Sequence, residues 1–292
     1  MVAKNVFAAA GWLCLLLSNL AVAGNNWLRD EGEAAYIAGV QYGATNQLFD
    51  KQGKLVPFPC AYSGQSLNQS LEYGYSYHYT LLADVPLQRY TCGQNSVAGI
   101  GDVALGVRGR IDDTTNGQAW EVKLLIPGGY NQNPPVPNPK PAGYMPMRLG
   151  YGELGVEMGA YFGESFDSYG TDPYEPQAAD NQPNHFAFGS YARVWRGAPA
   201  TQIGGYGRWN RALSANWGVG ANLGVNWTLG QGQALTNANY GTYSRSVLLS
   251  PEIKYTVAKG TVLNLSPSTV LYGQSASRMH SLTLGINQVF SK

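Results

Sequence analysis

The stretch NWGVGANLGVNWTLGQ, residues 216–231, divides into two faces when it is read in alternate positions. Its even positions from 218 to 228 carry only Gly, Asn and Thr, and its odd positions from 217 to 229 are all apolar: Trp217, Val219, Ala221, Leu223, Val225, Trp227 and Leu229. Successive side chains of a strand point to opposite faces, so this alternation predicts a β-strand with one apolar face. In a soluble sandwich that face would pack inward. In an outer-membrane barrel it would face lipid, and the small polar face would line the lumen.

The same alternation recurs along the chain and separates charged from apolar side chains. In the segment 99–111, Val103, Leu105 and Val107 share one face, and Arg108 and Arg110 share the other. Comparable segments predict about twelve strands, whose charges fall on the face that a barrel would turn to its lumen. We therefore expect the following charged residues to line a channel: Glu72, Asp84, Asp102, Arg108, Arg110, Glu121, Lys123, Glu153, Glu157, Arg208, Glu252 and Lys254.

Composition and strand length favour the barrel over the sandwich. Charged residues make up only 13% of the chain, which also contains 37 Gly and 20 Tyr. A membrane barrel needs an outer wall without charge, and its rims favour aromatic residues. Strands of roughly nine to eleven residues are also long for a sandwich and suited to a tilted membrane crossing. The sequence therefore predicts an all-β fold, a transmembrane antiparallel β-barrel of the bacterial outer-membrane type with about 12 strands.

The predicted connections alternate between short turns and longer loops. Bacterial barrels have short periplasmic turns and longer extracellular loops, so both termini should be periplasmic. Residues 163–184 break this rule, because a segment of about twenty residues stands where a short turn is expected. Short links are expected at residues 75–78, 112–117, 212–215 and 258–260, and long ones at residues 45–66, 130–148 and 231–243.

Two segments fit the alternation less well, and a third cannot form a strand. Residues 186–196 carry apolar side chains on both faces, and Arg89 falls on the apolar face at a strand end, where a membrane interface could accept it. Residues 131–146 are rich in proline, which lacks an amide donor and so cannot continue a strand. This segment is either a stiff exposed loop or a loop that folds into the lumen or binds a glycan.

The first residues have the order of a secretory signal. Lys4 precedes an apolar run over residues 6–20, and the small residues Ala21 and Ala23 flank Val22. We expect cleavage between Ala23 and Gly24, which separates a signal peptide, residues 1–23, from a single barrel domain, residues 24–292. A membrane-anchoring helix is the alternative, but the run is too short to span a bilayer comfortably. The protein should therefore be exported to the bacterial outer membrane.

Charge balance and motif spacing favour no enzyme, cofactor or nucleic-acid partner. The 19 Lys and Arg residues nearly balance the 18 Asp and Glu residues, which gives nucleic acid no electrostatic attraction. The three histidines lie in separate segments without metal-ligand spacing. His280, beside Ser277 and Ser281, is the one local candidate for the serine–histidine pair of an outer-membrane lipid-modifying enzyme. Its alternative role is an interfacial residue at the start of the last strand.

Cys60 and Cys92 are the two cysteines that remain after the expected cleavage. Export places them where disulfides persist, so we expect a bridge between them. The alternative is a pair of unlinked thiols, which would oxidise if exposed. A bridge would join the first two predicted extracellular loops and contribute a few kcal/mol to stability.

Five further motifs resemble those of an outer-membrane protein family. They are WLRDEGE at Trp27, LFDKQGK at Leu48, LEYGYSYHYTLLADVP at Leu71, GIGD at Gly99 and LGYGELGVEMG at Leu149. In this order they resemble XagA-like proteins, which are similar to the outer-membrane transporters associated with MetA-pathway phenol degradation. The resemblance implies a small barrel with a role in passive solute passage or in exopolysaccharide and biofilm biology, and it implies no catalytic residue. The chain departs from the family in residues 163–184, in the cysteine-bearing loops and in its ending, Val-Phe-Ser-Lys, which lacks a terminal aromatic. We expect Phe290 to serve instead as the late aromatic residue that the assembly machinery reads.

These observations together predict a porin-like passive channel or transporter for a small solute. One alternative is a non-conducting barrel that supports exopolysaccharide, biofilm or envelope organisation, and a third is the lipid-modifying enzyme. The expected partners are outer-membrane lipids, the barrel-assembly machinery and either a small solute or an exopolysaccharide.

Inward charges on four successive predicted strands fall at similar depth. They are Asp84, Arg108, the pair Glu121 and Lys123, and Glu157. Neighbouring strands lie less than about 5 Å apart, so these side chains are expected to form a ladder of alternating sign in which Arg108 compensates Asp84 and Glu121. The ladder is either a structural lattice that fills the lumen or a selectivity element beside an aqueous path. The absence of a single-signed ring favours a lattice that borders a narrow path.

Overall fold

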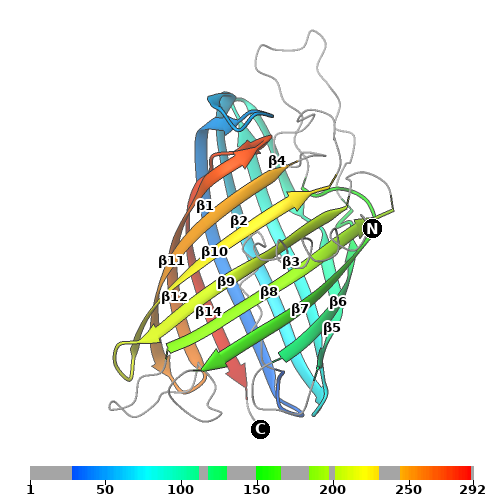
Figure 1. Cartoon of the computed structure of the whole chain (residues 1–292), viewed down its shortest axis with the longest axis vertical. Coiled ribbons are helices and arrows are strands. Elements are labelled where there is room, and N and C mark those ends of the chain that lie inside the picture. The colour runs from blue at the N-terminus through cyan, green and yellow to red at the C-terminus, as the bar shows by residue number, and fades with distance from the viewer. Residues whose placement is uncertain are drawn as a thin grey trace, which may run out of the picture.

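The computed structural model describes residues 28–111, 118–129, 149–165, 184–196, 201–229 and 244–290, and their strands form one closed barrel (Figure 1). Neighbouring strands pair antiparallel in chain order, and β1 (Ala34–Phe49) pairs with both β2 (Leu55–Ser76) and β14 (His280–Phe290), which closes the sheet. The predicted twelve-stranded antiparallel barrel is confirmed. No helix that could cross a membrane occurs among these residues.

Two of the barrel strands are interrupted. The segments β4 (Asn95–Ile100) and β5 (Val103–Arg110) both pair with β3 (Tyr79–Cys92) and together form one strand of the barrel. Similarly, the short β13 (Ala276–Ser277) precedes β14 along β1. The remaining strands are β6 (Gln118–Ile126), β7 (Gly155–Ser165), β8 (Asn184–Trp195), β9 (Gln202–Ala212), β10 (Trp217–Thr228), β11 (Arg245–Ala258) and β12 (Thr261–Gln274).

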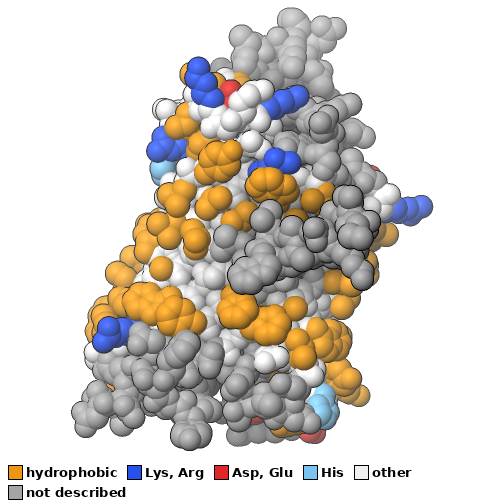
Figure 2. Space-filling view, in the orientation of Figure 1, with side chains coloured by type: hydrophobic (Ala, Val, Ile, Leu, Met, Phe, Trp, Pro, Cys, Tyr) orange, Lys and Arg blue, Asp and Glu red, His pale blue; other side chains and the backbone are white. Residues whose placement is uncertain are grey.

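The outer face of the barrel is apolar, as the alternation predicts. Figure 2 shows apolar side chains spread over the wall, and the Lys and Arg side chains in view lie toward its ends. Along β14, Leu284 is 60% exposed whereas its inward neighbour Thr283 is 5% exposed. In β10, Trp217 and Leu223 are exposed and Asn226 is buried. One face of each strand therefore meets the surroundings, and the other faces an interior of polar and small side chains.

The two ends of the barrel differ in their turns. The terminal end, where β1 begins and β14 ends, holds the short turns between β2 and β3, β9 and β10, and β11 and β12. The predicted short links 75–78, 212–215 and 258–260 are thereby confirmed. The signal peptide, residues 112–117, 130–148 and 231–243, and the proline-rich segment 131–146 lie outside the described residues. The opposite end, where β1 turns into β2 and β3 into β4, is called the disulfide end.

The prediction of a long loop at residues 45–66 is wrong. The strands β1 and β2 stay paired as far as Phe49 and Leu55, past a bulge between Thr45 and Gln47, and the chain reverses at residues 50–54. Pro57 lies in this extension of β2, and β2 pairs with β3 only from Tyr62 onward. Residues 55–61 are therefore an edge, where a missing amide donor costs no ladder bond to a second neighbour.

Residues 186–196, Arg89 and the strands on either side of residues 163–184 take ordinary places in the barrel. The strands β7 and β8 pair as far as Ser165 and His185, so residues 163–184 link neighbouring strands and the count of twelve stands. In β8, Phe186 and Phe188 are exposed on the outer face and Tyr191 is buried on the inner face, which explains apolar side chains on both faces. Arg89 is exposed on the outer face, in one row with Tyr42.

Candidate functional site

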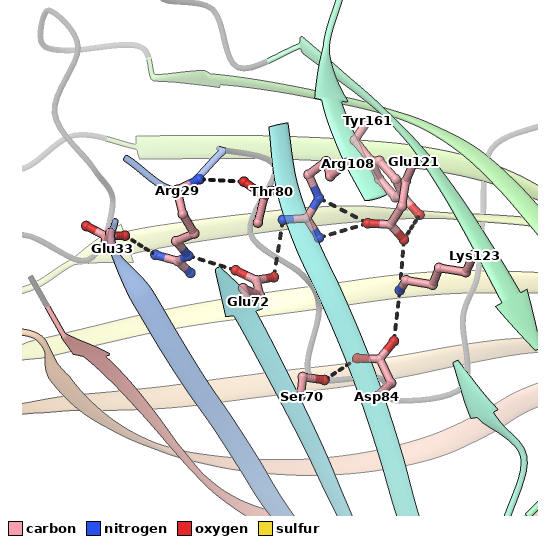
Figure 3. Close-up of polar contacts among 10 residues, drawn as sticks. All are labelled: Arg29, Glu33, Ser70, Glu72, Thr80, Asp84, Arg108, Glu121, Lys123 and Tyr161. Atoms are coloured by element: carbon pink, nitrogen blue, oxygen red, sulfur yellow. Dashed lines mark hydrogen bonds and ion pairs between the residues drawn. The ribbon is translucent and has the colours of Figure 1, made fainter. Parts of the chain in front are cut away.

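A cluster of charges lies on the inner wall where β2, β3, β5 and β6 meet (Figure 3). Arg108 of β5 lies opposite Glu121 of β6 in the register, and its Nη2 is 2.9 Å from Glu121 Oε2. The same guanidinium reaches past β3 to Glu72 of β2, with 3.2 Å between Nη1 and Oε1. Thr80, the β3 residue opposite Arg108, has a short side chain and so leaves room for Arg108 to reach Glu72 across β3.

The cluster continues from Glu121 through Lys123 to Asp84. The Lys123 Nζ lies 2.8 Å from Glu121 Oε1 and 3.0 Å from Asp84 Oδ2. Asp84 also accepts a 2.5 Å hydrogen bond from the Ser70 hydroxyl. The predicted ladder of alternating sign is therefore present. One of its contacts is wrong, because Asp84 is paired with Lys123, and Arg108 compensates Glu72 and Glu121 instead.

Arg29 adds a contact to this cluster that the strand pattern does not reveal. It precedes β1, is 3% exposed, and places Nε 2.8 Å from Glu72 Oε2. Its backbone N–H donates to Thr80 Oγ1 at 2.9 Å, and its Nη1 lies 3.3 Å from Glu33 Oε1. A Cβ at Gly74 would come within 1.9 Å of the Asp30 carbonyl oxygen, so glycine at this position permits the segment before β1 to pack inside.

The resulting main charge cluster joins three cations to four carboxylates on the inner wall. Glu72, Arg108 and Glu121 are each 3% exposed. The Tyr161 hydroxyl of β7 also donates to Glu121, at 3.2 Å. Ion pairs gain strength away from water, but each ion then depends on its partners because its own hydration is lost. The members are Arg29, Glu33, Glu72, Asp84, Arg108, Glu121 and Lys123.

Glu157 of β7 extends the row of charges around the wall. In the register it lies opposite Lys123 on one side and Arg193 of β8 on the other. The Arg193 Nε donates a hydrogen bond to Glu157 Oε2. The same guanidinium lies 4.6 Å from the ring centroid of Tyr191. The strand alternation does not mark Arg193 as inward, because β8 carries aromatic residues on its inner face as well as on its outer face.

A second charge cluster lies on β9 and β11. Arg208 Nη2 is 2.7 Å from Glu252 Oε2, and Lys254 Nζ is 3.6 Å from the same oxygen. Lys254 also donates to Asn210 Oδ1 at 2.9 Å. The intervening β10 offers Gly220 opposite both Asn210 and Glu252, which leaves room for these side chains to meet. The second cluster thus has two cations and one carboxylate, the reverse of the excess in the main cluster.

Besides Glu157, which pairs with Arg193, three of the predicted channel-lining residues belong to neither cluster. Asp102, between β4 and β5, accepts a hydrogen bond at 2.9 Å from the backbone N–H of Tyr151. Arg110, at the end of β5, donates to the Tyr77 hydroxyl at 3.2 Å and stacks 4.3 Å above its ring. Glu153 lies just before β7 and is half-buried. That all twelve predicted residues line a water path stays a prediction.

The predicted disulfide between Cys60 and Cys92 is present, with 5.4 Å between the two Cα atoms. Its expected position in loops is wrong, because Cys60 lies in β2 and Cys92 in β3. Cys92 is 1% exposed and forms a small apolar core with Phe58 and Tyr62. The bridge therefore fastens the strand extensions at the disulfide end.

The serine–histidine candidate does not assemble in the described residues. His280 Nδ1 pairs with the Thr269 hydroxyl at 2.9 Å, whereas the Ser281 hydroxyl pairs with Ser268 at 2.5 Å. Consecutive residues of a strand face opposite sides, which separates His280 from Ser281. Among the described residues no group of three His, Cys, Asp or Glu side chains could hold a metal ion.

Known structures with a similar fold include outer-membrane barrels. An outer-membrane channel from Pseudomonas putida F1 is 13% identical, with a TM-score of 0.66 over 91% of this chain and 98% of that one. The translocator domain of the autotransporter NalP from Neisseria meningitidis is 12% identical, with a TM-score of 0.47 over 98% and 94% of the two chains. The CymD monoaromatic hydrocarbon channel is 8% identical, with a TM-score of 0.42 over 90% and 89%.

No protein-family model and no curated protein sequence matches the chain. At these identities the likeness to the Pseudomonas putida channel concerns the fold alone. The chain is an all-β, closed, twelve-stranded antiparallel barrel with the architecture of bacterial outer-membrane proteins.

Proposed function

We propose that the protein is a passive channel or transporter for a small solute in the bacterial outer membrane. The observation that carries the proposal is the contrast between the two faces of one closed sheet. The outer face exposes apolar side chains, and the inner face carries two clusters of paired charges. A buried core without a transport role would be expected to be apolar, since each desolvated ion is costly. The similar fold of a bacterial channel supports the same proposal.

The pairing of the charges points to weak discrimination between ions. Cations and carboxylates alternate along the wall, and the described residues form no ring of one sign. Selective ion pores use rings of one sign or arrays of carbonyl dipoles. A wall of both signs instead offers donors and acceptors in turn, which suits polar solutes of little net charge.

The proposed function also includes a family resemblance, export through a signal peptide, and two partners in the outer membrane. The resemblance to XagA-like proteins and phenol-pathway transporters motivates a role in solute uptake or in exopolysaccharide biology. Residues 1–23 would direct export and then be removed by cleavage after Ala23. Outer-membrane lipids would cover the exposed apolar face. Phe290, 55% exposed at the end of β14, would present the late aromatic that the barrel-assembly machinery reads.

Liposome swelling tests the proposed transport. Purified protein is refolded into liposomes, its folding is checked by heat-modifiable migration on gels, and the vesicles are placed in isotonic solutions of uncharged solutes of increasing size. We expect swelling with the smallest solutes and none in protein-free vesicles. Folded protein that gives no swelling would favour the envelope-organising alternative. Release of fatty acid from the liposome phospholipids would favour the enzyme.

A further inference from the structure

The segment Leu149–Tyr151 lies inside the barrel at the disulfide end, although it belongs to no strand. Leu149 is 1% exposed and packs on the link between β4 and β5. A Cβ at Gly101 would come within 2.8 Å of the Leu149 carbonyl oxygen, and one at Gly99 within 2.9 Å of Leu149 Cδ1. The glycines of this link thus make room for a second inward-folded segment, in addition to the one that carries Arg29.

Tyr151 contacts parts of the wall that are far apart around the barrel. Its backbone N–H donates to Asp102 Oδ2 at 2.9 Å, and its hydroxyl accepts from Gln202 Nε2 at 2.7 Å. Its ring lies 4.7 Å from the ring of Trp195. Asp102 precedes β5 and Gln202 begins β9, so four inter-strand steps, about 19 Å along the wall, separate these contacts. A tyrosine is much shorter than that arc, so Tyr151 stands inside the curve of the wall.

We propose that Tyr151 determines which solutes pass the disulfide end of the lumen, and that they are small uncharged molecules with hydrogen-bonding groups. This inference rests on the proposed channel function and adds the residue that selects the solute. One hydrogen bond and one ring contact hold the side chain, and a second hydrogen bond holds the backbone N–H. Gly150 and Gly152 flank it, and Gly152 has a φ of 76°, a conformation that glycine adopts without strain. The backbone on both sides of Tyr151 is therefore glycine, which permits the rotation that would move the side chain aside.

The polar atoms beside Tyr151 indicate the chemistry of the solute. Gln202 Oε1 and Trp195 Nε1 are buried and have no hydrogen-bond partner in the described part of the chain. The hydroxyl of Tyr191 is also buried and has no hydrogen-bond partner among the described residues. When Tyr151 moves aside, an acceptor, a donor and a hydroxyl become available together. Of the charges near Tyr151, Glu157 and Arg193 pair with each other, and Asp102 accepts the hydrogen bond from the Tyr151 backbone N–H. A neutral solute with hydroxyl or amide groups matches this set, because unpaired buried polar groups are costly and gain most from a partner.

Substitution of Tyr151 tests the inference by conductance and by liposome swelling. Tyr151→Ala should raise the single-channel conductance at least about two-fold and admit larger uncharged solutes, because it removes the side chain that crosses the path. Tyr151→Phe and Gln202→Ala keep the ring and lose its hydrogen bond to Gln202, so both should give intermediate values. Tyr42→Ala is the matched control, since Tyr42 is 53% exposed on the outer face.

The outcomes separate this inference from the proposed function. A conducting wild type with unchanged conductance and size limit in Tyr151→Ala would overturn the role of Tyr151 and leave the channel in place. A silent wild type with a conducting Tyr151→Ala would support both. Folded protein that is silent in every form would refute the channel, and the inference with it. If Tyr151→Ala fails to fold, unchanged conductance in both Tyr151→Phe and Gln202→Ala would overturn the inference.

Discussion

Replacement of Arg108 by alanine tests whether the main charge cluster stabilises the barrel. Arg108 donates from Nε and Nη2 to Glu121 Oε2, at 3.0 and 2.9 Å, and from Nη1 to Glu72 Oε1 at 3.2 Å. Its loss leaves two cations against four carboxylates in the cluster. Removal of one partner of a buried ion pair typically costs about 3–5 kcal/mol. In the variant, Glu121 still pairs with Lys123, and Glu72 still pairs with Arg29. We therefore expect the free energy of unfolding to fall by an amount near the lower limit, about 3 kcal/mol.

The assay is reversible urea unfolding of the protein in lipid vesicles, followed by tryptophan fluorescence. Arg89→Ala is the matched control, because Arg89 is exposed on the outer face and forms no ion pair with another described residue. Surface substitutions of this kind change the free energy of unfolding by less than about 0.5 kcal/mol. An Arg108→Ala protein as stable as the Arg89→Ala control would refute the stabilising role of the cluster.

The other predictions concern selectivity, the disulfide and the segment before β1. In a conducting protein, Arg108→Ala should shift the reversal potential across a KCl gradient toward the value of a cation-selective channel. An unchanged reversal potential would show that Arg108 does not lie beside the ion path. Glu252→Gln should shift the reversal potential toward the value of an anion-selective channel, because the second charge cluster then holds cations alone. A shift toward cation selectivity would contradict this. Denatured protein should be alkylated at Cys60 and Cys92 only after reduction, and stoichiometric labelling before reduction would rule the bridge out. Gly74→Val should displace the segment before β1 and increase tryptic cleavage there, whereas unchanged protection would argue against its close packing.

The barrel could be predicted from sequence because two different surroundings act on alternate residues of every strand. In β10 the apolar odd positions and the small even positions already define both faces. The alternation of side chains does not show where a strand ends, because two neighbouring strands can stay paired through their backbones beyond the alternating segment. For this reason the extension of β1 and β2 as far as residues 50–54 was predicted as a loop.

The inward position of the charges could also be predicted, but only part of their pairing. The alternation along β5 and β6 places Arg108 and Glu121 on the inner wall, and the two residues lie directly opposite each other in neighbouring strands. The long reach of Arg108 past β3 to Glu72 depends on side-chain length and on the short Thr80, which strand spacing does not describe. Arg29 and Tyr151 lie outside the strands, so no alternation marks them as inward.

Single-channel recording of the purified, refolded wild-type protein in a planar lipid bilayer tests the central claim most directly. A passive channel predicts discrete, reproducible conductance steps on insertion, with weak preference between cations and anions because charges of both signs line the wall. The protein's folded state is established in the same preparation by heat-modifiable migration. Repeated insertion of folded protein without any conductance step would contradict the claim that this barrel is a channel.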